Sequence, residues 1–173
     1  LVQGQNRDIP TRVVPLARGG DRDAWNVALA DAVAELAPQV VVLAGFMRIL
    51  GAPLLERFPG KLVNVHPSLL PAFPGHDAPV QAVAAGVRIS GCTVHVVDQG
   101  VDTGPILAQA AVPVLPSDDA ASLHLRIQRA EHLLLPTVIH WIATGRVSLA
   151  PPTLHDAPSP EGCFVTPRFD VPA

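Results

Sequence analysis

Three side chains of different chemistry, an amide, an imidazole and a carboxylate, occur in two short segments of the chain. Asn64 and His66 belong to the segment NVHPSLLP, and Asp102 belongs to the later segment GVDTGP. Because side chains alternate between the two faces of a strand, Asn64 and His66 at a strand end point the same way. A carboxylate that reaches this imidazole completes a polarising site, which can stabilise charge and move a proton.

The elements that must position these side chains follow from hydrophobic patterns. A strand over 61–65 is expected to deliver Asn64 and His66 at its carboxyl end, where ligands collect in parallel α/β sheets. The run at 40–44 has no polar residue, as in a strand that is covered on both faces. The runs at 92–97 and 106–114 are predicted to be antiparallel neighbours, joined by a loop that carries Asp102.

Helical spacing and capping residues predict the remaining elements. Helices are expected over 24–36, capped by Asp21 or Asp23, over 53–58, over 79–86, and from the cap at 117–119 to about Gly145. A short apolar run at 11–15 suggests one more strand. Residues 1–150 are therefore predicted to form one domain, and the proline-rich residues 151–173 a loosely ordered C-terminal tail.

Composition limits what kind of protein this is. The chain has 173 residues, of which 49% are hydrophobic and 16% charged, as expected of a sheet buried under helices. Its net charge is −3 and no Lys/Arg cluster occurs, so nucleic acid is not an expected partner. No apolar stretch approaches the roughly 18 residues that span a bilayer, and no secretory signal is evident. Two isolated cysteines suit a reducing compartment, and a cytoplasmic protein without membrane contact is expected.

The polar residues also have simpler explanations. A single Asn or His at a strand end often only bridges loops. However, Asn64, His66, His95 and Asp102 all fall at strand ends or in adjoining loops, which is the usual sign of a binding cleft. A zinc site of two histidines and an aspartate is conceivable, but no metal-ligand spacing supports it. Ser68 lacks a Gly-x-Ser-x-Gly motif and is not expected to act as a nucleophile.

Three motifs in order, AGFMRIL at 44–50, NVHPSLLP at 64–71 and VDTGPI at 101–106, resemble those of the phosphoribosylglycinamide formyltransferases, which are folate-dependent enzymes of purine synthesis. The resemblance extends from about Asp21 to Gly145. Asn-x-His with a later Asp is shared with methionyl-tRNA formyltransferases and formyltetrahydrofolate hydrolases. The segment PSLLPAFPG after the histidine favours the glycinamide enzymes. The tRNA enzymes usually carry a basic loop at that place and an extra C-terminal domain, and the hydrolases an N-terminal regulatory domain.

The resemblance implies an open, mostly parallel twisted sheet with helices on both faces, whose N-terminal part is missing here. It implies formyl transfer from 10-formyltetrahydrofolate, as co-substrate, to the amine of glycinamide ribonucleotide, without a metal. Asn64 and His66 would donate hydrogen bonds to the developing oxyanion. Asp102 would orient His66 and favour its protonated form. A monomer or homodimer is expected.

Further roles come from matching positions in the resembling family. The residues implied to bind the folate are Arg22, Met47, Arg48, Ile49, Leu50, Asn64, Asp98, Gln99, Gly100, Val101 and Asp102. Those implied to contact the ribonucleotide are Gln128, Arg129, Ala130 and Glu131, with Glu131 near its amine. Thr93 and His95 are implied to support the catalytic residues from behind.

Two departures from the family keep alternatives open. The family's first strand and its Gly/Ser-rich phosphate loop have no counterpart before Arg12. In the segment 76–79 the histidine stands one place earlier than in the usual pattern. The alternatives are formylation of another amine, such as a sugar nucleotide, and a folate-binding fragment without activity.

Overall fold

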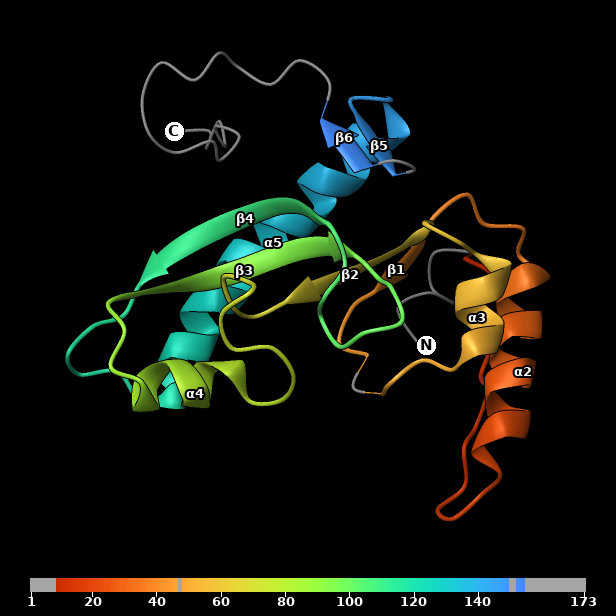
Figure 1. Cartoon of the computed structure of the whole chain (residues 1–173), viewed down its shortest axis with the longest axis horizontal. Helices are drawn as coiled ribbons and strands as arrows, with labels where there is room; N and C mark the ends of the chain where they lie inside the picture. Colours follow the sequence, from red (N-terminus) through yellow and green to blue (C-terminus); the bar gives the residue numbers. More distant parts are fainter. Residues whose placement is uncertain (1–8, 47, 150–151, 155–173) are drawn as a thin grey trace.

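The computed structural model describes residues 9–46, 48–149 and 152–154. Helices and strands alternate along most of this part of the chain, and two short strands follow the last helix (Figure 1). In chain order the elements are α2 (Arg22–Ala34), β1 (Val41–Leu43), α3 (Ala52–Arg57), β2 (Leu62–His66), α4 (Ala78–Ala84), β3 (Ile89–Val96), β4 (Ile106–Pro113), α5 (Ala120–Ala143), β5 (Val147–Leu149) and β6 (Pro152–Leu154).

The main sheet has the strand order β1-β2-β3-β4 and is mixed. β1 and β2 are parallel, with α3 in the connection between them, whereas β3 runs antiparallel to both β2 and β4. A loop alone can join antiparallel strands, and this is how β3 leads into β4. The predicted α/β architecture is observed, and so is the predicted antiparallel pair. The expected predominance of parallel strands does not hold among the described strands.

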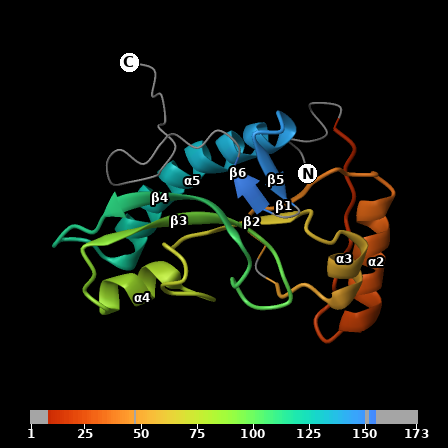
Figure 2. The same ribbon diagram turned by 45° about the horizontal axis from the view of Figure 1, so that its top comes forward.

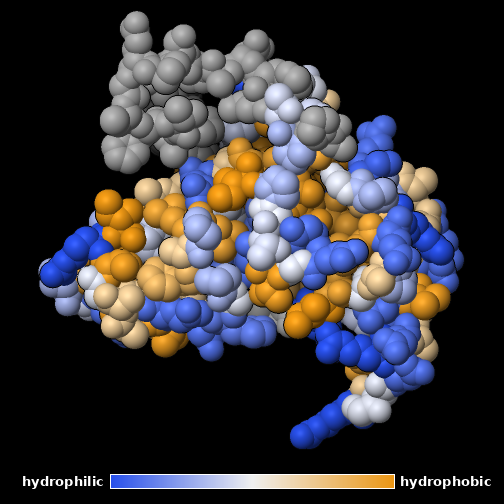
Figure 3. Space-filling view, viewed as in Figure 1, coloured by the Kyte–Doolittle hydropathy of each residue, from blue (hydrophilic) through white to orange (hydrophobic). Residues whose placement is uncertain are grey.

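Helices cover both faces of this sheet, as predicted. In β2 the side chain of Val63 belongs to the large core cluster that includes Val94 and residues of α5. The adjacent Leu62 points to the opposite face and packs with Ala30 of α2 and Leu54 of α3. Figures 1 and 2 show α5 along β3 and β4, and α2 and α3 side by side beyond β1. Hydrophilic side chains cover most of the α2–α3 end in Figure 3, because its apolar residues turn inward.

Capping residues explain where the two longest helices begin. The Asp21 side chain accepts hydrogen bonds from the first-turn amides of α2, at 2.9 Å and 3.0 Å. Asp119 and Ser122 form a reciprocal capping box at the start of α5. Gly145 follows α5 with a left-handed backbone, φ 74°, which glycine adopts without strain. Both caps and this stop were predicted from the sequence.

The remaining differences from the predictions are local. Residues 11–15 form no strand, and the Val14 carbonyl instead accepts a hydrogen bond from Trp25 Nε1 at 2.9 Å. β3 begins at Ile89, three residues before the predicted start. Part of the expected tail, Pro152–Leu154, pairs with β5 as a strand, and the rest of the tail lies outside the described residues. In the described ranges no helix is long and apolar enough to cross a membrane.

Candidate active site

Four polar side chains face one another across β2 and β3. In the antiparallel register Asn64 lies opposite His95, and His66 lies opposite Thr93. Directly opposed residues of an antiparallel pair point to the same face of the sheet. Asn64 Nδ2 is 3.2 Å from His95 Nε2, and His66, Thr93 and His95 are buried. The strand pairing therefore gathers one amide, one hydroxyl and two imidazoles at the carboxyl end of β2.

Asp102 reaches this patch from the loop between β3 and β4. Its Oδ2 lies 3.3 Å from His66 Nδ1, and its Oδ1 lies 3.6 Å from His95 Nε2. The Gly75 amide donates to the same Oδ2 at 2.8 Å, so the carboxylate is also held from the segment before α4. Asp102 has a left-handed backbone, φ 54°, a strained conformation that is concentrated at functional sites. The predicted meeting of Asn64, His66 and Asp102 is observed.

Hydrogen bonds within the loop that carries Asp102 hold its shape. The Asp98 carboxylate accepts hydrogen bonds from the Gly100 amide at 3.0 Å and from the Thr103 hydroxyl at 2.7 Å. A Cβ at position 100 would lie 2.0 Å from Thr103 Oγ1, so only glycine permits this close approach. The turn therefore fixes the backbone immediately before Asp102.

Both ring nitrogens of His66 face oxygen acceptors. Nδ1 lies beside the Asp102 carboxylate, and Nε2 is 2.9 Å from the Phe73 carbonyl oxygen. A carbonyl oxygen can only accept, so Nε2 carries the proton of this hydrogen bond. The bond fixes the ring with Nδ1 facing the Asp102 carboxylate.

His95 is held as a neutral ring, and this fixes the direction of Asn64. The Nδ1 of His95 is 3.0 Å from the Val96 carbonyl, so the proton resides on Nδ1. Burial lowers the pKa of His95 below its ordinary value, although Asp102 and the Val96 carbonyl act in the opposite direction. Nε2 then accepts from Asn64 Nδ2. Within the described part of the chain this is the only hydrogen bond of the Asn64 side chain, so its second N–H remains for a ligand.

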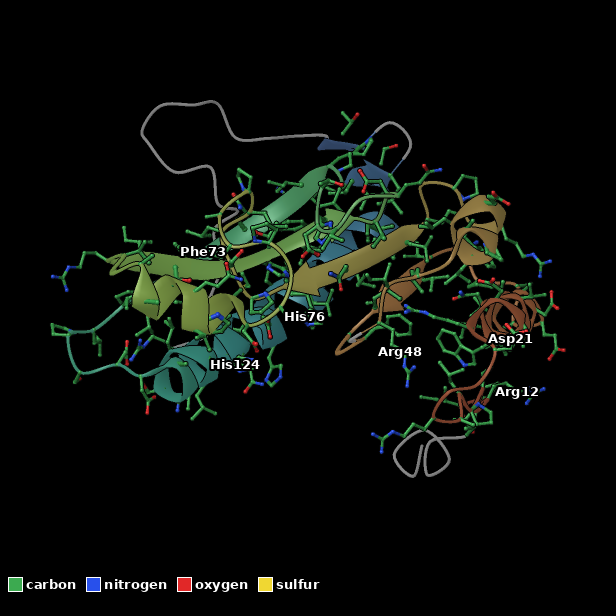
Figure 4. All side chains as sticks on the ribbon, turned by 60° about the horizontal axis from the view of Figure 1, so that its bottom comes forward. Arg12, Asp21, Arg48, Phe73, His76 and His124 are labelled. Carbon is green, nitrogen blue, oxygen red and sulfur yellow. The ribbon has the colours of Figure 1, made fainter. Side chains whose placement is uncertain are left out.

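The patch opens into a cavity of about 550 Å³. Its walls are the loop after β1, the loop after β3, the segment 75–80 and the first turns of α5. Figure 4 shows Arg48 towards the α2 side of this region, His124 on α5 and His76 between them. A cavity of this size with a few convergent polar groups is typical of a small-molecule site.

Most residues that the sequence implied for folate binding line this cavity together: Arg48, Ile49, Leu50, Asn64, Asp98, Gln99, Gly100, Val101 and Asp102. Arg22 does not line it. Instead its Nη2 donates to the Ile49 carbonyl at 3.0 Å and so holds the wall from behind. Met47 lies outside the described residues.

The four residues implied for ribonucleotide contact, Gln128, Arg129, Ala130 and Glu131, do not line the cavity. α5 lines it through Ala120, Ala121 and His124. Burial raises the pKa of Glu131, and this is offset in part by His124, His132 and His66. Glu131 therefore lies outside the cavity lining, near enough to His124 and His66 for their charges to affect its carboxyl.

Sequence reasoning missed several groups that surround the triad of Asn64, His66 and Asp102. The Phe73 carbonyl and the Gly75 amide are backbone groups, which have no side-chain signature. The prolines around them indicated only a loop of restricted shape. His124 was assigned no chemistry, because a histidine on an amphipathic helix does not reveal from sequence which cavity it lines.

Neither a metal centre nor a reactive thiol is apparent in the described ranges. No group of three or more His, Cys, Asp or Glu side chains there could hold a metal ion. Burial, together with the nearby Glu131, raises the pKa of Cys92 to about 12, so this thiol remains protonated.

Known proteins share this sequence pattern. The formyl transferase family model matches residues 1–139. The chain is 51% identical over 141 residues to the phosphoribosylglycinamide formyltransferase of Mycobacterium tuberculosis, a match that covers 82% of this chain and 66% of that protein. The chain thus spans just under two thirds of the length of this relative.

Solved structures share the fold. Glycinamide ribonucleotide transformylase 1 from Symbiobacterium toebii is 45% identical with a TM-score of 0.76, over 79% of this chain and 65% of that one. A formyltetrahydrofolate deformylase from Pseudomonas syringae pv. tomato is 28% identical with a TM-score of 0.83, over 90% of this chain and 52% of that one. The family model covers most of the chain, and both the motifs and the fold agree with it. The chain belongs to the formyl transferase family.

Proposed function

We propose that this protein transfers a formyl group from 10-formyltetrahydrofolate to the amine of glycinamide ribonucleotide. The observation that carries the proposal is the meeting of Asn64, His66 and Asp102 at one cavity, with Asp102 Oδ2 3.3 Å from His66 Nδ1. The names of the relatives from Mycobacterium tuberculosis and Symbiobacterium toebii support glycinamide ribonucleotide as the acceptor.

The cavity suits a folate as the formyl donor. Its lining combines apolar side chains, such as Leu50 and Val97, with polar side chains, such as Asp98 and Gln99. A flat heterocycle with polar edges needs both kinds of group, because its faces pack against apolar surface and its edges form hydrogen bonds. The donor would bind with its formyl group towards Asn64 and His66.

The first chemical step creates negative charge on the formyl oxygen. The amine lone pair forms a bond to the formyl carbon, and the carbonyl electrons move onto oxygen. The free N–H of Asn64 would donate to this oxygen, and the His66 ring, which lies beside Asp102 at the cavity, would supply the second donor. Donors of this kind, held in place before the reaction, lower the barrier by about 3–4 kcal/mol each.

The second requirement is movement of one proton. The attacking nitrogen must lose a proton, and N10 of the folate must gain one when its bond to the formyl carbon breaks. The Asp102 carboxylate, 3.3 Å from His66 Nδ1, would accept the proton and return it to the leaving nitrogen. The protein needs no covalent bond to the formyl group.

Transfer of an isotopically labelled formyl group tests this function. The protein is incubated with labelled 10-formyltetrahydrofolate and either glycinamide ribonucleotide, an amino-sugar nucleotide or no amine. Label in formylglycinamide ribonucleotide is the expected result. Preferential labelling of the sugar nucleotide would reassign the acceptor. Release of labelled formate at the same rate without an amine would mean hydrolysis, the activity named for the structural relative from Pseudomonas syringae.

A further inference from the structure

A row of three polar side chains crosses the sheet next to the loop that follows His66. His66 of β2 lies opposite Thr93 of β3, and Thr93 lies opposite Gln109 of β4. Opposed residues in antiparallel strands share a face, so Gln109 points to the same face as His66 although β3 separates their strands. The proposed chemistry gives Gln109 no part.

The hydrogen bonds of Gln109 and Thr93 use every donor that the two side chains offer. Gln109 Nε2 donates to the Leu70 carbonyl at 2.9 Å and to Thr93 Oγ1 at 3.0 Å. Thr93 Oγ1 accepts from the Leu70 amide at 3.0 Å and donates to the Ser68 carbonyl at 2.7 Å. A hydroxyl has one hydrogen and two lone pairs, so Thr93 is saturated and the direction of its O–H is determined. Together the two side chains form hydrogen bonds with both backbone polar groups of Leu70, its N–H and its C=O.

The loop rests directly on the sheet at this place. A Cβ built at Gly91 of β3 would lie 2.9 Å from Leu69 Cδ2 and 2.0 Å from the Ala110 carbonyl, so a side chain at this position would collide with the loop. Further along the loop, the Ser68 hydroxyl donates to the Ala72 carbonyl. The next residue, Phe73, has a left-handed backbone, φ 55°, and its carbonyl oxygen lies 2.9 Å from His66 Nε2.

We propose that Gln109 is a positioning residue for His66 and acts through Thr93 and the loop 68–73. The inference rests on the proposed function only in taking His66 as the reacting group. The His66 ring is held between two partners: its Nδ1 lies 3.3 Å from the Asp102 carboxylate, and its Nε2 is hydrogen-bonded to the Phe73 carbonyl. Gln109 and Thr93 fix the loop that supplies the second partner, and this sets the ring angle at which Nδ1 faces Asp102.

Two substitutions of similar size test the proposal. Gln109→Glu removes both N–H donors and turns a carboxylate towards the Leu70 carbonyl, and Gln109→Met removes the donors without adding charge. Each is expected to lower kcat at least tenfold, because a misplaced catalytic group is costly, with KM for both substrates within about twofold of wild type. Gln39→Glu is the matched control, since Gln39 is exposed and does not line the active-site cavity.

A second measurement needs no turnover. In nitrogen-15 NMR of the unliganded protein, the Nε2–H of His66 should exchange slowly with solvent in wild type and rapidly in both Gln109 variants. The Nδ1–H of His95, which is bonded to the Val96 carbonyl and not to the loop, should be unchanged and serves as the internal reference. A general loss of folding would change both signals.

The outcomes separate this inference from the proposed function. Faster exchange at His66 alone, together with a lower kcat, supports the positioning role. Unchanged exchange at His66, or kcat within twofold of wild type in both variants, overturns it, and so does equal disturbance of His66 and His95. If wild-type protein transfers no formyl group, the proposed function fails, and the exchange measurement still decides whether Gln109 positions His66.

Discussion

At the scale of single residues, His66 is the group on which most of the site depends. It is buried, its Nε2 is hydrogen-bonded to a backbone carbonyl, and its Nδ1 faces a carboxylate. In the proposed mechanism Asn64 and His66 stabilise the oxygen and Asp102 moves the proton, and His66 also contacts the loop behind it through the Phe73 carbonyl. Removing its side chain therefore affects charge stabilisation and proton movement together.

We expect His66→Ala to lower kcat by about 10²- to 10³-fold, because its hydrogen bond forms mainly in the transition state. The affinity for a folate analogue, measured by calorimetry, should change little. His140→Ala is a suitable control, because His140 is exposed near the end of α5 and does not line the cavity. Turnover by His66→Ala equal to wild type would contradict the assignment.

His95 predicts how stability depends on pH. Burial lowers the pKa of His95 in the folded state below its ordinary value of 6.5, so the unfolded chain takes up a proton first as the pH falls. The free energy of unfolding should therefore decrease from about pH 6.5 downwards, until the pH passes the folded-state pKa. Urea denaturation from pH 7.5 to pH 5 measures this, and His95→Gln should have the shallower dependence. Equal slopes for the two proteins would contradict the prediction.

Glu131 is expected to affect the pH dependence of the free energy of unfolding in the opposite direction to His95. Burial raises the pKa of this carboxyl, so its ionised form costs stability at neutral pH, and the cost disappears below about pH 4.5, the ordinary value. Glu131→Gln should therefore increase the free energy of unfolding at pH 7 but not at pH 4. If Glu131 contacts the amine substrate, the same variant should lose activity, an exchange of stability for function that is common at binding sites. A less stable variant at pH 7 would contradict this account.

At the scale of elements, the first turns of α2 hold the loop after β1 against the cavity. Arg22 donates to the Ile49 carbonyl at 3.0 Å, and Asn26 Oδ1 accepts from the Gly51 amide at 3.2 Å. The Trp25 ring stacks on Phe46, with centroids 6.5 Å apart, and the Arg48 guanidinium lies 5.4 Å from the Trp25 ring centroid. One helix end therefore sets the position of Arg48 in the cavity wall.

Substitution of Trp25 tests this arrangement. Trp25→Leu removes the aromatic face under Arg48, and KM for 10-formyltetrahydrofolate should rise about two- to fivefold, the equivalent of about 0.5–1 kcal/mol of cation–π energy. kcat should change less, because the triad is supported by other elements. Trp25→Phe retains an aromatic face and should restore most of the affinity. A Leu variant with wild-type KM would show that Arg48 needs no such support.

At the scale of the whole molecule, the cavity joins parts of the chain that are far apart in sequence. Arg48 lies after β1, Asp102 after β3 and His124 in α5, yet all three line the same cavity. The chain spans 66% of the Mycobacterium tuberculosis relative. Binding of each substrate to this chain is therefore a separate question.

We expect a folate analogue to bind this chain and raise its melting temperature, since the residues implied for folate binding are grouped at one cavity. Glycinamide ribonucleotide should bind as well if the chain carries the complete acceptor site. Calorimetry with each ligand separates the alternatives. Folate binding without ribonucleotide binding would indicate a folate-binding fragment, and no folate binding would contradict the proposed function.

The sequence by itself determined the local elements and the chemistry of the site. Capping at Asp21 and Asp119 and the apolar periodicity gave the long helices to within a few residues. The run before Asn64 gave the strand that presents His66, and the two runs on either side of Asp102 gave the antiparallel pair. These features depend on local conformational preferences and on side-chain types, and both can be read directly from the sequence.

Only the tertiary structure decided which groups meet. It brought the Phe73 carbonyl and the Gly75 amide to the triad, placed Gln109 in one row with His66, and lined the cavity with His124 instead of residues 128–131. It also set the mixed direction of the described sheet. Backbone groups are the same at every position, and strand register is fixed by packing between distant segments. Residue types and their spacing therefore predict neither the backbone groups that reach the site nor the register of the strands.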